Sequence, residues 1–364
     1  MRPYPKYYLL YPLSLLYGAF VFLRNILYDR GVLPSREHDI PVICVGNLAA
    51  GGTGKTIHVD YLVRLLKAEY RVAVLSRGYR RRSRGFRIVM ADDTVSLAGD
   101  EPLQIAARHP DITIAVDRNR NHGIEQLLKL KPETGVIILD DGFQHRSLTP
   151  GRSIVLSEYS NLYTDDCLLP CGRLREHRYN IRRADIILIT KTPPALNAMD
   201  RRIMFRNLGK FPYQNLYFTA LKYGSPLPVF HGSAMTIENM ETVRGNRVML
   251  ITGIANPLPL KEHLESLTAG VVHRAYPDHH NFTREDMANI SRDRLFVGEG
   301  PFYIFTTEKD AVRLRMHTDL PEIIKGNLYF IPVEAEFLND DALEFNNHII
   351  NYVRKNKGNR RIPG

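Results

Sequence analysis

Short apolar runs alternate with longer amphipathic stretches along most of this chain. The apolar runs have the length of buried strands, and most of the stretches between them have the roughly 10 to 15 residues of connecting helices. The runs lie at 41–46, 71–76, 113–116, 135–140, 153–157 and 185–190, and then at 247–253, 271–276, 301–307 and 328–333. This alternation predicts an α/β fold: a mainly parallel sheet with helices on both faces, and a second, smaller α/β domain. Residues 213–228, rich in tyrosine and proline, are expected to connect the two.

The beginning of the chain departs from this alternation. Residues 7–23 contain no charged side chain, and basic residues precede and follow them. The segment is shorter than the ~20 apolar residues of a typical membrane-spanning helix. No small-residue cleavage motif of a signal peptide follows it. Its tyrosines and flanking arginines favour a helix that lies in the headgroup region of a membrane over one that packs on the protein itself.

A glycine-rich turn joins the first strand-like run to the next helical stretch, in the sequence VICVGNLAAGGTGKT. Glycines let backbone N–H groups surround an anion, and the helix N-terminus adds partial positive charge. Lys55 supplies a full charge and Thr56 a hydroxyl for Mg²⁺. The strict pattern has glycine at position 49, but the glycines that follow compensate, so a phosphate loop is favoured over a plain turn. The expected phosphate-binding residues are Ala49, Ala50, Gly51, Gly52, Thr53, Gly54, Lys55 and Thr56.

This motif and the apolar pattern predict three parts. Residues 1–32 are expected to form a membrane-associating helix, residues 33–218 a P-loop domain, which the family resemblance given below implies is a kinase domain, and residues 219–364 a smaller α/β domain with a basic C-terminal tail.

Two pairs of carboxylates follow in the sequence. Asp140 and Asp141 end an apolar run, where a P-loop enzyme needs a carboxylate for Mg²⁺ or its waters, although the same residues also make plain turns. Asp100 and Glu101 lie between a glycine and a proline at the start of a helical stretch. From these residues alone, helix capping explains the second pair better than catalysis does.

Three further loops carry charged or imidazole groups. Residues 168–176 are rich in arginine and glycine, which suits the clamping of a transferred phosphoryl group. His279 and His280 match no structural zinc spacing, so a histidine that orients a carboxylate base is favoured there. Residues 307–311 follow an apolar run, and their charges are either functional or a helix cap.

The net charge indicates which kinds of partner the protein binds, and the cysteine content indicates its redox environment. The formal net charge of +10 favours anionic partners such as nucleic acid, anionic lipid or a phosphorylated substrate. Three cysteines cannot build a disulfide framework, which fits a reducing, cytosolic setting.

Eight motifs together resemble one family, the tetraacyldisaccharide 4′-kinases of lipid A biosynthesis. In order along residues 46–311 they are GNLAAGGTGKT, LSRGY, GDEP, LDDGFQH, LPCGRLRE, TGIANP, PDHHNF and TEKDA. The resemblance implies transfer of the γ-phosphate of ATP to the 4′-hydroxyl of tetraacyldisaccharide 1-phosphate, which forms the lipid A precursor lipid IVA. It also implies a requirement for Mg²⁺ and a location at the cytoplasmic face of a bacterial inner membrane.

The resemblance also implies roles for individual residues. Lys55 would hold the phosphates, and Asp100 would be the general base for the sugar hydroxyl, paired with His279. Arg175, favoured over Arg173, would stabilise the transferring phosphoryl group. The residues that would support the metal are Thr56, Glu101, Asp140 and Asp141.

Two other functions compete with this hypothesis. A P-loop ATPase or GTPase switch, or a targeting factor at the membrane, shares the glycine-rich loop, but the chain has no clear Asn-Lys-x-Asp guanine signature. A nucleic-acid-binding kinase would fit the charge, but the basic residues form no aromatic-interleaved platform. The expected partners are therefore the lipid substrate and a membrane surface, without nucleic acid and without an obligate protein partner.

Overall fold

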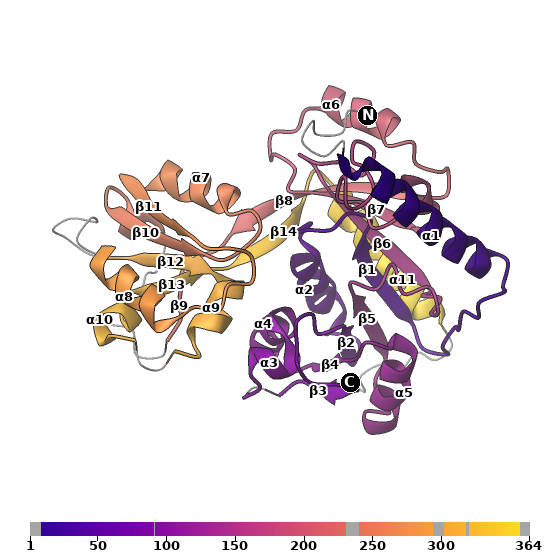
Figure 1. The fold of residues 1–364 in the computed structure, drawn as a ribbon, viewed down its shortest axis with the longest axis horizontal. Coiled ribbons are helices and arrows are strands. Elements are labelled where there is room, and N and C mark those ends of the chain that lie inside the picture. The colour runs from indigo at the N-terminus through magenta and orange to yellow at the C-terminus, as the bar shows by residue number, and fades with distance from the viewer. Residues whose placement is uncertain (1–8, 91, 231–239, 294–301, 318–319, 357–364) are drawn as a thin grey trace. The chain divides into compact units, whose positions relative to one another are not determined.

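The computed structural model describes residues 9–90, 92–230, 240–293, 302–317 and 320–356 (Figure 1). The chain forms two compact units. The first comprises Met1–Asp92, Ile105–Leu221 and Ala335–Gly364, and the second comprises Asp93–Gln104 and Lys222–Glu334. Each unit has its own sheet and its own buried core.

The sheet of the first unit has the strand order β14-β8-β7-β6-β1-β5-β2-β4-β3. Its strands are β1 (Val42–Asn47), β2 (Val72–Ser76), β3 (Arg87–Ile88), β4 (Thr113–Val116), β5 (Val136–Asp140), β6 (Arg152–Glu158), β7 (Ile186–Thr190), β8 (Asn215–Tyr223) and β14 (Val333–Phe337). The pairings from β8 through β4 are all parallel, whereas β3 is antiparallel to β4. The predicted α/β class with a mainly parallel sheet is confirmed.

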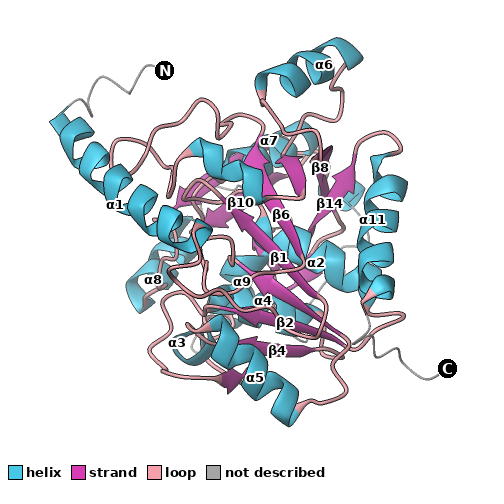
Figure 2. Cartoon of the chain, turned by 90° about the vertical axis from the view of Figure 1, so that its right-hand side faces the viewer, coloured by secondary structure: helices cyan, strands magenta, loops and turns pink. Residues whose placement is uncertain are grey.

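Both faces of this sheet are covered. Successive strand residues point to opposite faces, and neighbours such as Ile43 and Cys44 are both buried. The main helices are α1 (Tyr11–Asp29), α2 (Lys55–Leu66), α5 (Arg120–Leu130), α6 (Ala198–Asn207) and α11 (Asp341–Lys355) (Figure 2). Helix α2 contacts β1 and β5 and shares a face with α11, since the rings of Tyr61 and Phe345 lie 5.9 Å apart. Ile124 of α5 is buried in a core cluster that also contains strand residues such as Leu75 and Ala115. The sheet therefore holds α2, and with it the predicted phosphate loop, from the carboxyl end of β1.

The second unit repeats the α/β principle on a smaller scale, with the strand order β11-β10-β12-β13-β9. Its strands are β9 (Leu227–Pro228), β10 (Arg247–Thr252), β11 (Gly270–Ala275), β12 (Ile304–Thr307) and β13 (Leu328–Ile331). Its helices are α3 (Val95–Ala98), α7 (Leu258–Leu267), α8 (Arg284–Asp293), α9 (Glu308–Leu314), α10 (Glu322–Lys325) and the start of α4 (Asp100–Arg108). Strands β11, β10, β12 and β13 pair in parallel, and β9 is antiparallel to β13.

The compact units divide the chain differently from the boundaries expected at residues 32 and 218. The expected connector over 213–228 contains the boundary between the units, which falls between Leu221 and Lys222. Its first part is more than a connector, because strand β8 also pairs with β7 in the large sheet. The end of the chain also returns to the first unit, since Phe345 of α11 packs against Tyr61 and Tyr217. Both differences arise from long-range pairing, which the local sequence pattern does not contain.

Candidate active site

The phosphate loop of the first unit is held by the side chain that ends β1. Asn47 Nδ2 donates to the Thr53 hydroxyl at 3.0 Å and to the Gly51 carbonyl at 3.4 Å. Gly54 has φ +86° and precedes the first residue of α2, a backbone conformation that favours glycine. The unpaired N–H groups of the first helical turn therefore lie directly after the loop, which is the usual geometry of a phosphate site.

The side chain of His58 links this loop to strand β8. The sequence analysis did not identify this residue. Its buried ring lies 2.8 Å from the Gly54 carbonyl through Nδ1 and 3.0 Å from the Thr219 hydroxyl through Nε2. Burial lowers the pKa of His58 to about 4, so the ring is neutral at pH 7. Nδ1–H therefore donates to the carbonyl, and Nε2 accepts from Thr219. The only available signal in the sequence was a histidine one turn after Gly54 on the apolar side of the helix.

Two cations and one carboxylate meet at the start of α2. Lys55 Nζ lies 3.6 Å from Asp141 Oδ1, and the Arg175 guanidinium donates to both oxygens of Asp141 at 2.9 and 3.0 Å. Strands β1 and β5 are parallel neighbours, which brings the residues after their carboxyl ends together. Burial alone would raise the pKa of Asp141, but the charges of Lys55 and Arg175 outweigh it and hold that pKa below its usual range.

Arg175 and Arg173 have different partners, which separates the two expected candidates. The backbone of their loop pairs with the phosphate loop: Ala50 N–H donates to the Arg173 carbonyl at 2.7 Å, and Arg175 N–H donates to the Leu48 carbonyl at 2.8 Å. The side chain of Arg175 lies at Asp141, whereas Arg173 pairs with Asp166 at 3.0 Å. Arg175 is therefore the arginine that the fold brings to Lys55.

Asp140 and Asp141 also differ in their surroundings. Asp140 is fully buried and accepts a hydrogen bond from Ser76 at 3.1 Å. The Arg120 guanidinium, which sequence analysis missed, is also buried and donates to the Asp140 carbonyl at 3.2 Å. The side chain of Asp141 is 27% exposed and carries the contacts to Lys55 and Arg175. Asp141 is thus the accessible member of the pair.

A second charged cluster lies in the second unit, around the first residue of α4. His279 Nδ1 lies 2.7 Å from Asp100 Oδ2, and Lys309 Nζ lies 3.2 Å from His279 Nε2. Lys309 also pairs with Glu101 at 3.3 Å. Because the lysine is only a donor, His279 accepts at Nε2 and donates from Nδ1–H to Asp100. The expected pairing of Asp100 with His279 is therefore present in the geometry.

The charges of this cluster favour an ionised Asp100. Burial alone would raise its pKa, but the hydrogen bond from His279 and the charge of Lys309 outweigh burial and lower the pKa below its usual range. His279 has φ +60° in its turn, and its backbone N–H donates to the Gly253 carbonyl at 3.0 Å. An ionised, oriented carboxylate with one oxygen on a histidine can accept a proton from an alcohol.

The remaining residues of the histidine loop and of the TEKDA motif serve mainly structure. His280 Nε2 lies 2.8 Å from Asp286 and belongs to a separate contact. Thr307 caps α9 by accepting from the Asp310 N–H. The same segment nevertheless supplies Lys309, whose role sequence analysis left open between function and capping.

Helix α1 docks on the first unit through polar side chains. Its two buried residues are Ser14 and Asn25. Ser14 Oγ donates to the Leu168 carbonyl at 3.1 Å, and Asn25 Nδ2 donates to Glu176 at 3.2 Å. The Tyr17 hydroxyl donates to the Arg175 carbonyl at 2.6 Å. The helix is therefore fastened to the same loop that carries Arg175.

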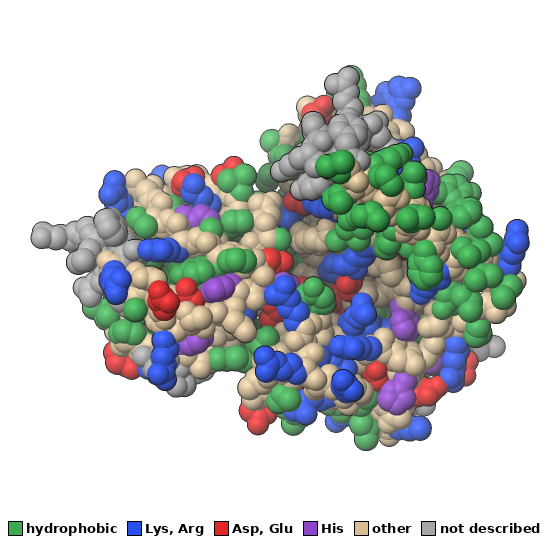
Figure 3. All heavy atoms as spheres, in the orientation of Figure 1, with side chains coloured by type: hydrophobic (Ala, Val, Ile, Leu, Met, Phe, Trp, Pro, Cys, Tyr) green, Lys and Arg blue, Asp and Glu red, His purple; other side chains and the backbone are tan. Residues whose placement is uncertain are grey.

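The outer side of α1 is apolar. Six large side chains are 53–69% exposed: Leu13, Leu15, Leu16, Phe20, Phe22 and Leu23. Figure 3 shows the hydrophobic side chains that gather over this helix. No helix within the described residues is both long and apolar enough to cross a membrane.

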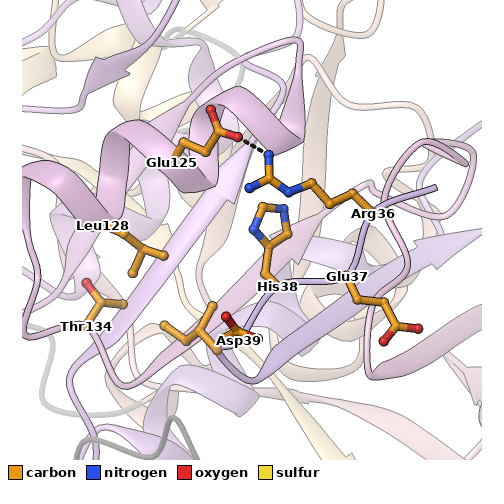
Figure 4. A pocket seen from close by; sticks show the side chains of 8 residues that line it. Arg36, Glu37, His38, Asp39, Glu125, Leu128 and Thr134 are labelled. Atoms are coloured by element: carbon orange, nitrogen blue, oxygen red, sulfur yellow. Dashed lines mark hydrogen bonds and ion pairs between the residues drawn. The ribbon is translucent and has the colours of Figure 1, made fainter. Parts of the chain in front are cut away.

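A pocket of about 390 Å³ lies elsewhere on the first unit, between residues 36–40 and α5 (Figure 4). Arg36 forms an ion pair with Glu125 there, and His38 lies 2.9 Å from Asn121. None of the expected site residues lines this pocket.

A parallel sheet, a glycine-rich loop that opens a helix with a lysine, and an aspartate on the neighbouring strand define a P-loop enzyme of phosphoryl transfer. A family model described as Tetraacyldisaccharide-1-P 4′-kinase matches residues 7–353. This chain belongs to that family and is a kinase of lipid A biosynthesis.

Relatives named tetraacyldisaccharide 4′-kinase agree over nearly the whole length. The protein from Phocaeicola vulgatus is 47% identical over 360 residues, which is 96% of each chain. The one from Porphyromonas gingivalis strain W83 is 40% identical over 352 residues, covering 95% of this chain and 97% of the relative. The solved structure of LpxK from Aquifex aeolicus in complex with ATP is 28% identical and has a TM-score of 0.70. It covers 94% of this chain and 98% of that one. The resemblance inferred from the eight motifs is confirmed.

Proposed function

We propose that this chain performs the 4′-kinase reaction of its family with two separate sets of residues. The first unit binds ATP: the backbone N–H groups after Ala50 in the loop and the Lys55 ammonium hold the phosphates, whereas the Ala50 N–H donates to the Arg173 carbonyl. Arg175 neutralises charge on the phosphoryl group during transfer. Support comes from the distances of 3.6 and 2.9 Å at which Lys55 and Arg175 lie from Asp141. Both cations are thus oriented toward the end of the phosphate loop.

The chemistry of the expected donor set fits Mg²⁺. The expected ligands offer only oxygen, as a hydroxyl from Thr56 and carboxylates from Glu101, Asp140 and Asp141, and oxygen is what this cation prefers. Asp141 is ionised and accessible, so it and Thr56 are the first residues that would hold the ion. Within the described chain, no three His, Cys, Asp or Glu side chains are grouped to hold a metal ion by themselves. Mg²⁺ suits such a site, because it usually binds through one or two carboxylates together with substrate phosphates and water, and when bound it neutralises phosphate charge.

Asp100 is the general base in this proposal. Its carboxylate accepts the proton of the 4′-hydroxyl while the sugar oxygen bonds to the γ-phosphorus. The bond from that phosphorus to the β–γ bridging oxygen breaks, and ADP leaves with the electron pair. His279 orients Asp100 from Nδ1, and Lys309 holds the other imidazole nitrogen. Asp100 is a catalytic residue, whereas Lys309 positions the histidine.

The observation that carries this assignment is the buried, ionised Asp100 with His279 at 2.7 Å. The test combines ATP labelled at the γ-phosphate, Mg²⁺ and tetraacyldisaccharide 1-phosphate in detergent micelles. Asp100→Asn should lower kcat by about 10²–10⁴-fold while ATP binding persists. Asp286→Asn is the matched control, since Asp286 is also bonded to a histidine of the same turn but lies outside the cluster. Full turnover in Asp100→Asn would reject Asp100 as the base.

The lipid substrate and the exposed face of α1 favour action at a membrane surface. The six exposed apolar side chains of α1 would enter the lipid layer, while Ser14, Tyr17 and Asn25 keep the helix on the loop of Arg175. The protein would then be peripheral, at the cytoplasmic face of the inner membrane, where ATP and the lipid precursor are both available. No nucleic acid or obligate protein partner enters this proposal.

A further inference from the structure

Helix α6 of the first unit presents a second unusual surface. None of the ten described residues of α6 is buried. Its inner side is held by Arg201, which pairs with Asp341 at 2.7 Å and lies over the Phe218 ring, and by Met204, which packs against the core of the sheet. The rest of the helix is available to solvent.

The outward side of α6 combines apolar and cationic side chains. Met199, Arg202, Ile203 and Arg206 are spaced by three, four and seven residues, so they share one helical stripe. At 100° per residue this stripe lies opposite Arg201 and Met204. Met199 is 67% exposed and Ile203 47%, although solvent-facing positions of an ordinary surface helix are polar.

A hollow beside this stripe is suited to an anionic group. It has a volume of about 460 Å³ and is lined by Ala198, Arg201, Arg202, Phe205 and Arg206. The guanidinium groups of Arg202 and Arg206 beside the ring of Phe205 match the composition of a lipid headgroup region, where phosphates lie beside the first methylene groups. Arg201, also in the lining, is already paired with Asp341. Lys210 adds a further cation, with Nζ 4.7 Å from the ring centroid of Phe205.

Figures 1 and 2 both place α6 and the beginning of α1 toward the upper edge of the first unit. Helix α5 lies at its lower edge in both views.

We propose that α6 is a second membrane contact, which binds the surface of a bilayer that contains anionic phospholipid. Arg202 and Arg206 attract the phosphate groups, and Met199, Ile203 and Phe205 enter between the headgroups. The inference rests on the proposed membrane association and adds to it a contact that depends on lipid charge. A neutral protein surface would satisfy the apolar residues but not the cluster of arginines, which is why an anionic lipid surface is favoured.

The experiment measures binding of the full chain to vesicles by co-sedimentation, with either phosphatidylcholine alone or phosphatidylcholine with phosphatidylglycerol. The double variant Arg202→Gln/Arg206→Gln should bind the anionic vesicles about 25-fold more weakly, about fivefold for each arginine. Ile203→Glu should weaken binding to both kinds of vesicle. Lys129→Gln/Leu130→Glu is the matched control, because it removes one cation and one exposed apolar side chain from α5. All variants should retain wild-type kcat on micellar substrate.

The outcomes separate this inference from the proposed function. If wild type binds no vesicles, the membrane association proposed for α1 fails, and α6 fails with it. If wild type binds but the α6 variants bind equally well, or if the α5 control loses as much, only the α6 contact is overturned. Equal binding of wild type to neutral and anionic vesicles would also overturn it. Loss of micellar activity in the α6 variants would point instead to a structural role.

Discussion

Helices α1 and α2 differ in which side chains they bury. Helix α1 has the more apolar sequence, yet its buried side chains are Ser14 and Asn25. Helix α2 is less apolar, yet half of its twelve residues are buried: His58, Val59, Asp60, Leu62, Val63 and Leu66. The difference follows from position, because α2 connects two parallel strands and must lie on the sheet, whereas α1 precedes the first strand and is free to dock by a polar stripe.

This contrast has a functional side. Burial of α2 keeps Lys55 and Thr56 at a fixed point beyond β1, as phosphate binding requires. Exposure of the apolar side of α1 leaves that side accessible, as the proposed membrane contact requires. The helix that opens at the phosphate loop and the helix proposed to meet a membrane therefore differ in which face the protein covers. Substitutions in the two helices should accordingly have very different effects on the free energy of unfolding.

The largest effect is expected for Leu62→Ala in α2. Leu62 is 1% exposed, so its truncation removes apolar contacts and leaves a cavity that costs about 2–5 kcal/mol. Urea unfolding followed by circular dichroism measures this difference. A loss below about 1 kcal/mol would mean that α2 is less firmly packed on the sheet than its burial indicates.

The next effect depends on pH and concerns His58. Its pKa is lowered from 6.5 to about 4 in the folded protein, so between these values the unfolded chain binds more protons. The stability associated with the neutral ring is complete above pH 6.5 and is lost as the pH falls toward 4, by up to about 3 kcal/mol. His58→Gln removes the titrating group and should flatten the unfolding free energy over this pH window relative to wild type.

Substitution of His58 should also change the KM for ATP. Glutamine can still donate to Gly54 and accept from Thr219, so His58→Gln should keep more ATP affinity than His58→Ala, measured as KM for ATP. If both variants show the same pH dependence of unfolding as wild type, His58 does not titrate as inferred.

A smaller effect is expected on the inner side of α1. Asn25→Ala removes the hydrogen bond to Glu176 and should lower stability by about 1–2 kcal/mol. Since the same face of α1 holds the loop of Arg175, kcat on micellar substrate should fall as well, with KM for ATP little changed. Unchanged kcat would show that α1 does not position this loop.

The smallest effect on unfolding is expected on the outer side of α1. Leu16 and Phe20 are both 69% exposed, so Leu16→Ser/Phe20→Ser should change stability by about 0.5 kcal/mol or less. Binding to vesicles should nevertheless fall at least about tenfold, because each side chain contributes apolar area to the lipid contact. A loss of stability above about 2 kcal/mol would instead mean that this face is covered by protein.

Much of the fold and part of the site could be predicted from sequence. Strand segments such as 113–116 matched their observed bounds, because buried parallel strands are short apolar runs. The loop over residues 49–56 was recognisable, since phosphate binding depends on neighbours in the chain. The role of β8 was not predicted, nor was the return of α11 to the first unit, because both rest on pairing between distant residues.

The charged clusters around Asp141 and Asp100 were likewise predicted only in part from the sequence. Motif order pointed to Asp100 and His279, which are 179 residues apart in the chain, but Lys309 was recognised only as part of a charged segment. The motif already favoured Arg175 over Arg173, and the structure adds that the side chain of Arg175 lies at Asp141 whereas that of Arg173 pairs with Asp166.

The sequence by itself determined the α/β class, the phosphate loop, the kinase family and the presence of an apolar N-terminal helix. These depend on local periodicity and on contiguous motifs. Only the tertiary structure decided that α1 buries its polar stripe, that His58 fastens Gly54 to β8, and that Lys309 completes the cluster around Asp100. Each of these depends on which distant side chains share a buried space, and burial is a property of the folded chain as a whole.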